Sequence, residues 1–295
     1  MGFKSESQKY ALAAFFLFGL TNFILGVITE SSPDPGAASL SAPLLLWSGM
    51  GLLGLAAGMR RRVPAPREPW KKTLPVLAGI TLAAGMMSLK TAFALMPSAK
   101  GALVAVTAAN ALVVALFSLS FLGEKLVFGQ WLALGLIILG IAVLGGAPGR
   151  ITPAAMGLGL LTMMLFGVTN FLLKLAAHVG WQPLNAVKRL WLSAGTCGLL
   201  GLAYVFLTDR GLAGLPSWPL RGAALAAGLT LGLGMLSLKI AVGRGKAGPA
   251  TAIAGANAVL VAVLDALLYA HIPAPASLLG MVLALGGMIL LVGRR

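Results

Sequence analysis

Long apolar runs separated by short polar segments extend along the whole chain. Each run is long enough to cross about 30 Å of hydrocarbon, for which a helix needs roughly 20 residues. Transmembrane β-strands would be about 10 residues long with strict alternation, and the run at 131–144 does not alternate. The pattern therefore predicts an all-α integral membrane protein. The ten predicted spans are 11–29, 40–59, 73–96, 101–122, 127–146, 153–177, 184–207, 219–243, 247–270 and 274–292.

The composition agrees with this pattern. Of the 295 residues, 59% are hydrophobic and 10% are charged, whereas a soluble domain is about 45–50% apolar and about 25% charged. The 39 glycines fall largely inside the apolar runs, where small residues let helices approach closely. Turn-forming and charged residues separate most of the runs, as at 31–36, 60–64, 148–150 and 209–211.

The net charge of +15 would suggest a nucleic-acid partner in a soluble protein. Here most basic residues flank apolar runs, so we expect the lipid bilayer and no nucleic acid. Basic residues accumulate on the cytoplasmic side of membrane proteins. With the N-terminus inside, 15 of the 22 Lys and Arg residues fall inside and 4 outside. This predicts a multi-pass protein of a bacterial-type inner membrane with both termini cytoplasmic.

The first apolar run could instead be a signal peptide. Its length exceeds the roughly 7–15 residues usual for that segment, and its sequence recurs later in the chain. We therefore expect it to remain as a transmembrane helix.

Few residues are available for covalent or metal chemistry. The chain has one cysteine, Cys197, two histidines and 7 acidic residues, so it has no disulfide framework and no short cluster with metal-ligand spacing. A membrane-embedded enzyme would need a catalytic group of such residues, and no phosphate-binding loop of the Gly-x-x-x-x-Gly-Lys-Ser/Thr type occurs. We expect no enzyme activity, no cofactor, no metal and no direct use of ATP.

An internal repeat is the most informative feature of the sequence. Leu17–Phe23 returns as Leu165–Phe171 with six identities in seven positions at an offset of 148. Residues 79–92 match 228–241 at nine of 14 positions, including a Ser-Leu-Lys sequence, and Ala-Asn-Ala at 109–111 recurs 147 residues later. This predicts a duplication, with one repeat at 1–148 and the other at 149–295.

Each predicted half contains five helices. Because five is odd, the second half enters the membrane from the opposite side, and the halves are related by a pseudo-two-fold axis in the membrane plane. Secondary transporters commonly have this symmetry, with the substrate near the bilayer midplane between the repeats. The fold class predicted is therefore ten transmembrane helices in a 5+5 inverted-topology repeat.

The residues around the middle of each half resemble a known family. In segment 91–144, Gly123-Glu124-Lys125 separates two apolar helices and glycines punctuate the second. This segment is similar to the repeat of the EamA family in the drug/metabolite transporter superfamily, and segment 240–292 resembles the second copy. The resemblance implies a ten-helix transporter. The proline often found midway along the fourth and ninth helices of that family is here Asn110 and Asn257, and the glutamate closing the fourth helix has His271 as its counterpart.

Two equivalent lysines are candidate substrate ligands. An ionisable group within the bilayer by default faces the bundle interior or a watery cavity. Lys90 and Lys239 occupy matching positions in helices that we expect to run in opposite directions, so one should lie nearer each membrane face. This arrangement favours an anionic substrate. Alternatively, each lysine snorkels to its nearer interface, or one carries a coupling proton.

Four asparagines complete the candidate site. Buried amides need partners, which are either another helix or a ligand, so inter-helix hydrogen bonding is the alternative. Asp265 is the only acidic residue deep in a predicted helix, and its counterpart is Ser118. Asp265 is a candidate for ion coupling, or it forms an ion pair with a nearby lysine. The substrate-binding candidates are Asn22, Lys90, Asn110, Asn170, Lys239 and Asn257.

The function predicted from the sequence is secondary active transport of a small polar, anionic metabolite by alternating access. The alternative is a flippase of the same fold that carries a lipid phosphate or an amphipathic head group. The partners expected are a small-molecule substrate and the bilayer, and the sequence is also compatible with a homo-oligomer.

Overall fold

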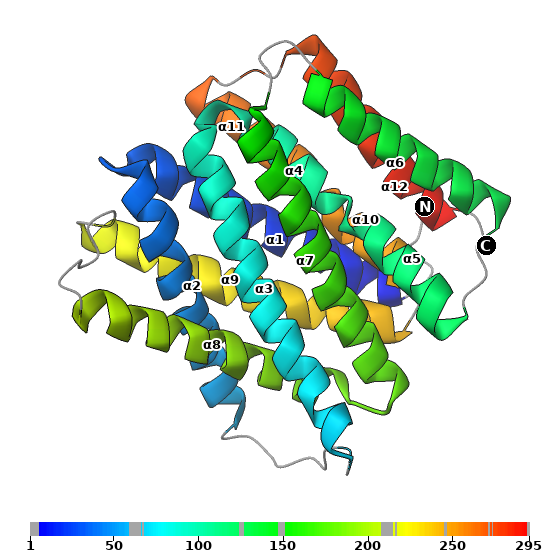
Figure 1. Cartoon of the computed structure of the whole chain (residues 1–295), viewed down its shortest axis with the longest axis horizontal. Coiled ribbons are helices and arrows are strands. Elements are labelled where there is room, and N and C mark those ends of the chain that lie inside the picture. The colour runs from blue at the N-terminus through cyan, green and yellow to red at the C-terminus, as the bar shows by residue number, and fades with distance from the viewer. Residues whose placement is uncertain are drawn as a thin grey trace.

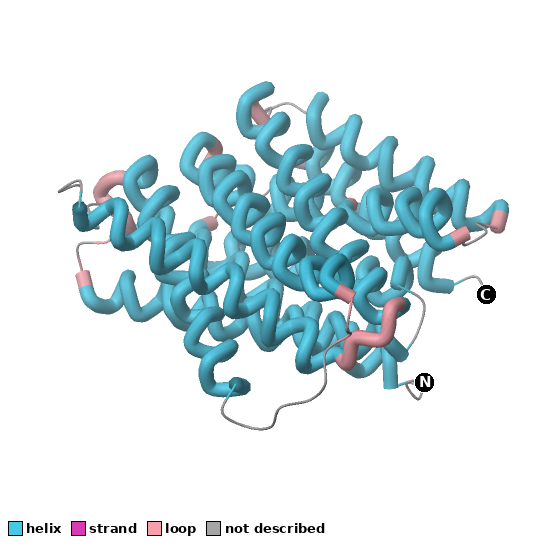
Figure 2. The backbone as a smooth tube through the Cα atoms, turned by 60° about the horizontal axis from the view of Figure 1, so that its bottom comes forward, coloured by secondary structure: helices cyan, strands magenta, loops and turns pink. Residues whose placement is uncertain are grey.

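The computed structural model describes most of the chain, and every regular element in it is a helix (Figure 2). The all-α class is therefore confirmed for these residues. Several features interpreted from the sequence lie outside the described residues: the segments 60–64, 148–150 and 209–211, the Glu124-Lys125 pair and His271. The described residues are 6–58, 66, 68–123, 127–146, 151–207, 215, 217–244, 247–270, 272 and 274–293.

Helices occupy each of the predicted apolar segments (Figure 1). Their bounds are α1 (Glu6–Ser31), α2 (Pro35–Gly58), α3 (Pro69–Leu95), the short 3₁₀ helix η1 (Pro97–Ala99), α4 (Lys100–Ala108), α5 (Asn110–Leu122), α6 (Phe128–Gly146), α7 (Pro153–His178), α8 (Pro183–Leu207), α9 (Trp218–Arg244), α10 (Ala247–Gly255), α11 (Asn257–Tyr269) and α12 (Pro275–Gly293).

Many of these helices are suited to a bilayer. Within the described residues, seven helical stretches are long and apolar enough to cross a membrane, the stretch 102–122 being made of α4 and α5 together. Large apolar side chains such as Leu199, Leu200 and Phe206 are exposed on the outside of the bundle, where lipid rather than water satisfies them. The protein is a multi-pass membrane protein.

The prediction of one continuous helix at 101–122 and another at 247–270 is wrong, because each of these helices is interrupted. The first breaks at Ala109, between α4 and α5, and the second at Ala256, between α10 and α11. Both alanines have ψ near zero, at 5° and −4°, and the amide of each bonds to the carbonyl three residues back in a tight turn. The two breaks lie 147 residues apart, at equivalent positions of the repeat.

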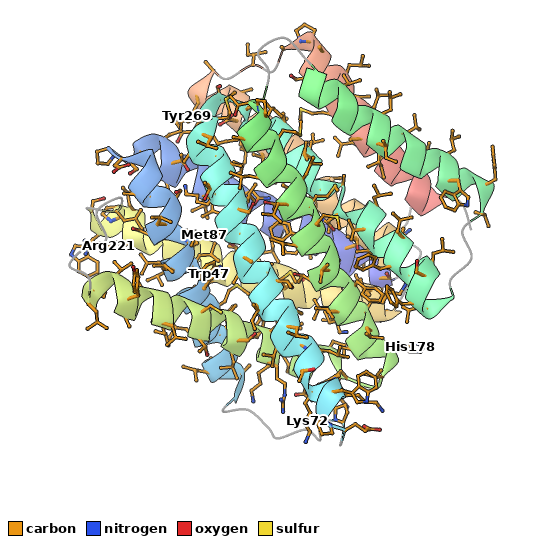
Figure 3. All side chains as sticks on the ribbon, in the orientation of Figure 1. Trp47, Lys72, Met87, His178, Arg221 and Tyr269 are labelled. Carbon is orange, nitrogen blue, oxygen red and sulfur yellow. The ribbon has the colours of Figure 1, made fainter. Side chains whose placement is uncertain are left out.

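The helices pack in pairs that follow the sequence repeat. α1 packs on α9 and α3 packs on α7, which are equivalent pairings when α1 is matched to α7 and α3 to α9. α2 packs on α8, and α6 on α12, the pair seen at the upper right of Figure 1. Figure 3 shows Lys72 near the start of α3 and His178 at the end of α7 at the same end of the bundle, with Tyr269 at the opposite end.

Glycines bring the paired backbones into close contact. A Cβ added at Gly195 in α8 would lie 2.4 Å from the Cα of Gly51 in α2. At the α6 and α12 pair, a Cβ on Gly140 would lie 2.5 Å from the backbone nitrogen of Ala284, and one on Gly287 would lie 2.6 Å from the carbonyl oxygen of Ala133. The glycine-rich composition therefore sets the distances between helices, as small residues do in membrane bundles.

Candidate functional site

A cavity of about 60 Å³ lies where the two broken helices meet α1 and α7. The four candidate asparagines all line it, two from each half of the chain. Asn22 is on α1 and Asn170 is on α7, whereas Asn110 and Asn257 are the first residues after the two helix breaks. The structure thus brings together four of the six substrate-binding candidates.

The breaks determine where two of these amides point. The side-chain nitrogen of Asn110 donates to the carbonyl of Thr107 at 2.9 Å, and that of Asn257 donates to the carbonyl of Ala254 at 2.7 Å. Asparagine competes in this way with the helical backbone ladder, and each bond holds the side chain against the turn that precedes it. Each amide oxygen is then directed away from its own helix.

The amides pair across the two halves. Nδ2 of Asn22 donates to Oδ1 of Asn257 at 3.0 Å, and Nδ2 of Asn170 donates to Oδ1 of Asn110 at 3.0 Å. In each pair one residue belongs to the first repeat and the other to the second. Inter-helix hydrogen bonding, the alternative considered for these residues, is therefore present, and it occurs in the wall of the cavity rather than apart from it.

The remaining wall repeats the same symmetry. Phe18 and Phe166 are equivalent residues, as are Met86 and Met235, and all four line the cavity. Beside them, the hydroxyl of Thr169 forms a 2.8 Å hydrogen bond with that of Thr81 on α3. The equivalent hydroxyls of Thr21 and Thr230 form the same bond at 2.8 Å. The cavity is an apolar chamber in which neutral polar groups are arranged in equivalent pairs.

The two lysine candidates are not part of the described cavity wall. Lys90 and Lys239 have no exposed surface. The ammonium of Lys90 donates to the carbonyl of Leu25 at 2.7 Å and to the hydroxyl of Thr29, and that of Lys239 donates to the carbonyl of Leu173. Both carbonyls belong to the helix that opens the same half of the chain. The lysines tie α3 to α1 and α9 to α7, and their contact with a substrate stays a prediction.

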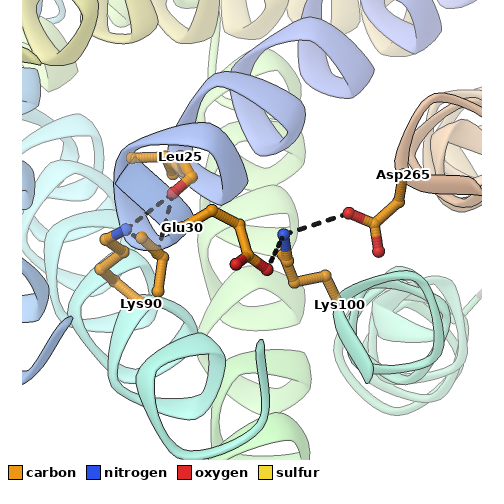
Figure 4. A network of polar contacts seen from close by, with 6 residues as sticks. Leu25, Glu30, Lys90, Lys100 and Asp265 are labelled. Carbon is orange, nitrogen blue, oxygen red and sulfur yellow. Dashed lines mark hydrogen bonds and ion pairs between the residues drawn. The ribbon is translucent and has the colours of Figure 1, made fainter. Parts of the chain in front are cut away.

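Asp265 belongs to a buried charged cluster that joins three helices (Figure 4). The ammonium of Lys100, the first residue of α4, lies 3.1 Å from Oδ1 of Asp265 on α11 and 2.9 Å from Oε1 of Glu30 on α1. The same ammonium lies 4.8 Å from the ring centre of Tyr269. The ion-pair alternative for Asp265 is confirmed, and it does not by itself exclude a coupling role.

The sequence interpretation missed Lys100, which is one of the four basic residues that it counted as lying outside. Its side chain is 1% exposed and packs over α1 at Gly26, where an added Cβ would lie 3.0 Å from its Cδ. Two signals pointed to it. Asp265 needed a cationic partner within the bundle, and Gly26 replaces the lysine found at the equivalent position, Lys174.

The equivalent place in the other half has different chemistry. There Lys174 on α7 donates to the hydroxyl of Ser118 on α5 at 2.9 Å. Ser118 is the counterpart of Asp265. One end of the bundle therefore has a lysine between two carboxylates, and the other has a lysine on a serine hydroxyl.

Comparison with known proteins identifies a fold and no function. One solved structure, described only as "Crystal structure of protein", is similar over 96% of this chain and 95% of its own, with a TM-score of 0.69 and 20% sequence identity. At that identity the likeness shows a shared fold. No family model and no curated protein matches the chain. Among the described residues, no group of three or more His, Cys, Asp or Glu side chains could hold a metal ion.

Proposed function

We propose that this protein is a secondary transporter that moves a small polar metabolite across a membrane by alternating access. The observation that carries the proposal is the cavity between two broken helices, lined by four asparagines that pair across the repeats. In transporters with inverted repeats, substrates bind where helices are interrupted, because the freed backbone and the adjacent polar groups face a cavity.

The proposed architecture is ten membrane-spanning helices in two inverted repeats, 1–148 and 149–295. It is supported by the nearly constant sequence offset of 147–149 residues and by the equivalent helix pairings of the two halves. The start of α1 and the end of α12 lie toward the same side of the molecule (Figures 1 and 2), as an even number of crossings requires. We propose that this side faces the cytoplasm of a bacterial-type cell, as the distribution of basic residues indicates.

Resemblance to the EamA family supports the same proposal without defining a substrate. The flippase alternative receives less support from the cavity. Among the described residues that line it, none is a Lys or Arg that would bind a lipid phosphate. A transporter can enclose a small solute in such a chamber, whereas a lipid head group with its attached chains needs an opening along the side of the bundle.

Cysteine accessibility tests this proposal. We expect a thiol introduced by Ala108→Cys, which lines the cavity, to react with a membrane-impermeant maleimide from both sides of the membrane in a Cys197→Ser background, because alternating access exposes the site to each side in turn. The matched control is Ala42→Cys, which is buried on α2 outside the cavity wall and should not react. If Ala108→Cys reacted from neither side, or only from one, alternating access at this cavity would be contradicted.

A further inference from the structure

We propose that the substrate presents to the cavity an uncharged group that donates and accepts hydrogen bonds, as a hydroxyl or a carboxamide does, on a compact apolar body. This inference rests on the proposed transport function and names the substrate class for the same cavity. It differs from the anionic substrate expected from the sequence, whose two lysines are not among the described residues of the cavity wall.

The first step is the fixed orientation of two amides. Because Nδ2 of Asn257 is held by the carbonyl of Ala254, its Oδ1 must be the atom that faces Asn22. In the same way, the bond from Asn110 to the carbonyl of Thr107 presents the Asn110 oxygen to Asn170. Each pair therefore has an acceptor on the broken helix and a donor on the facing helix.

The second step is what a ligand must do to enter such a pair. A group that separates Asn22 from Asn257 has to accept a hydrogen bond from the first residue and donate one to the second. Hydroxyl and carboxamide groups do both, whereas a carboxylate only accepts and an ammonium only donates. A carboxylate that accepts from Nδ2 of Asn22 cannot donate to Oδ1 of Asn257, and an ammonium that donates to that oxygen cannot accept from Asn22. A charged group would therefore leave one of these two atoms without its partner, and an unpaired buried polar group is costly.

The third step concerns the surroundings of the pairs. Phe18, Phe166, Met86 and Met235 supply apolar wall around the amides. A charge buried in such surroundings needs an opposite charge beside it, and neither lysine candidate is among the described residues that line the cavity. Aromatic and thioether side chains instead suit an apolar portion of the substrate.

The repeat provides the donor and acceptor arrangement twice. The pair Asn22 and Asn257 and the pair Asn170 and Asn110 are equivalent under the offset of 147–148 residues. A substrate with two such neutral groups can take the place of the hydrogen bond in both pairs at once. A substrate with one such group can bind to either pair as the two halves exchange conformation.

Three thiol reagents of similar length test the inference on the purified protein in liposomes. They are the hydroxyethyl, sulfonatoethyl and trimethylammonioethyl methanethiosulfonates, which are neutral, anionic and cationic. Each is applied to Ala108→Cys, and separately to Thr251→Cys, which also lines the cavity. Rates are divided by those at Ser217→Cys, an exposed position, to remove differences in intrinsic reactivity. We expect the neutral reagent to react at least tenfold faster than both charged reagents at both cavity positions.

Other outcomes have distinct meanings. A sulfonatoethyl rate equal to or above the neutral rate would overturn the uncharged class in favour of an anion, and a trimethylammonioethyl rate that high would overturn it in favour of a cation. Three equal rates would show that the cavity does not select by charge and would also overturn the inference, while leaving the transport proposal intact. Absence of reaction with every reagent at both positions would contradict the transport proposal itself.

Discussion

The amide groups of four asparagines pair within the wall of the cavity. Each pair contributes one hydrogen bond between side chains, and the residue on the broken helix adds a second bond to a carbonyl of the preceding turn. Burying an amide whose hydrogen bonds are made costs little free energy. An amide left without its partner destabilises the protein by about 1–3 kcal/mol. In the proposed transport cycle, the same amides stabilise the conformation seen here and bind a solute when the pairs separate.

A double-mutant cycle tests this pairing at single residues. We expect Asn22→Ala and Asn257→Ala to be coupled by about 1 kcal/mol in the free energy of unfolding, because the second substitution removes an interaction that the first has already lost. The matched control combines Asn22→Ala with Asn110→Ala, which are not hydrogen-bonded to one another in the structure, and should be additive. Unfolding in mixed detergent micelles provides the measurement, and equal coupling in the two cycles would contradict the pairing.

At the scale of the helix, the two breaks are the feature that the sequence did not predict. The segments 101–122 and 247–270 are largely apolar, and neither has a proline directly at Ala109 or Ala256, so their hydrophobic pattern alone does not predict an interruption. The cause is the asparagine one residue later, whose side chain bonds to the carbonyl three residues back. An asparagine within a helix can form such a side-chain bond to the backbone, but packing against the neighbouring helices decides whether the bond forms.

The ends of the helices next to the cavity differ in their charged contacts. Lys100 holds α4 to both α1 and α11 through Glu30 and Asp265 (Figure 4), whereas at the equivalent place Lys174 contacts Ser118. Removing one partner of a buried ion pair costs about 3–5 kcal/mol, whereas a hydrogen bond between an ammonium and a hydroxyl contributes about 1.5–3 kcal/mol. The end with the ion pairs should therefore be the harder one to open.

Exchanging the residues at the two equivalent positions tests this difference. We expect Asp265→Ser to increase labelling of Ala108→Cys from the membrane face at which α1 ends, because Lys100 then retains only Glu30 as a carboxylate partner at this contact. Conversely, Ser118→Asp should replace the hydroxyl at the Lys174 contact with a carboxylate and decrease labelling from the opposite face. Labelling rates from the two faces are the measurement, and changes that are equal on both faces would contradict the account.

For the whole molecule, the sequence repeat predicted more than the apolar pattern did. The helical class and the positions of the apolar segments followed from hydrophobicity, and the four asparagines followed from their recurrence at a constant offset. Recurrence also singled out Lys90 and Lys239, but it could not show that their ammoniums bond to the backbone of a neighbouring helix. Lys100 was missed because it has no lysine at the equivalent position and lies beside a turn. Contacts between distant segments of the chain determine these details.

The inverted relation of the two halves is the central claim, and two equivalent positions test it directly. Glu68 and Ser217 are exposed, lie 149 residues apart and each directly precede an equivalent helix, α3 or α9. In a Cys197→Ser background, Glu68→Cys and Ser217→Cys are treated with an impermeant maleimide in intact cells and in inside-out vesicles. The account predicts that Ser217→Cys is labelled only in cells and Glu68→Cys only in vesicles. Labelling of both from the same side would contradict it.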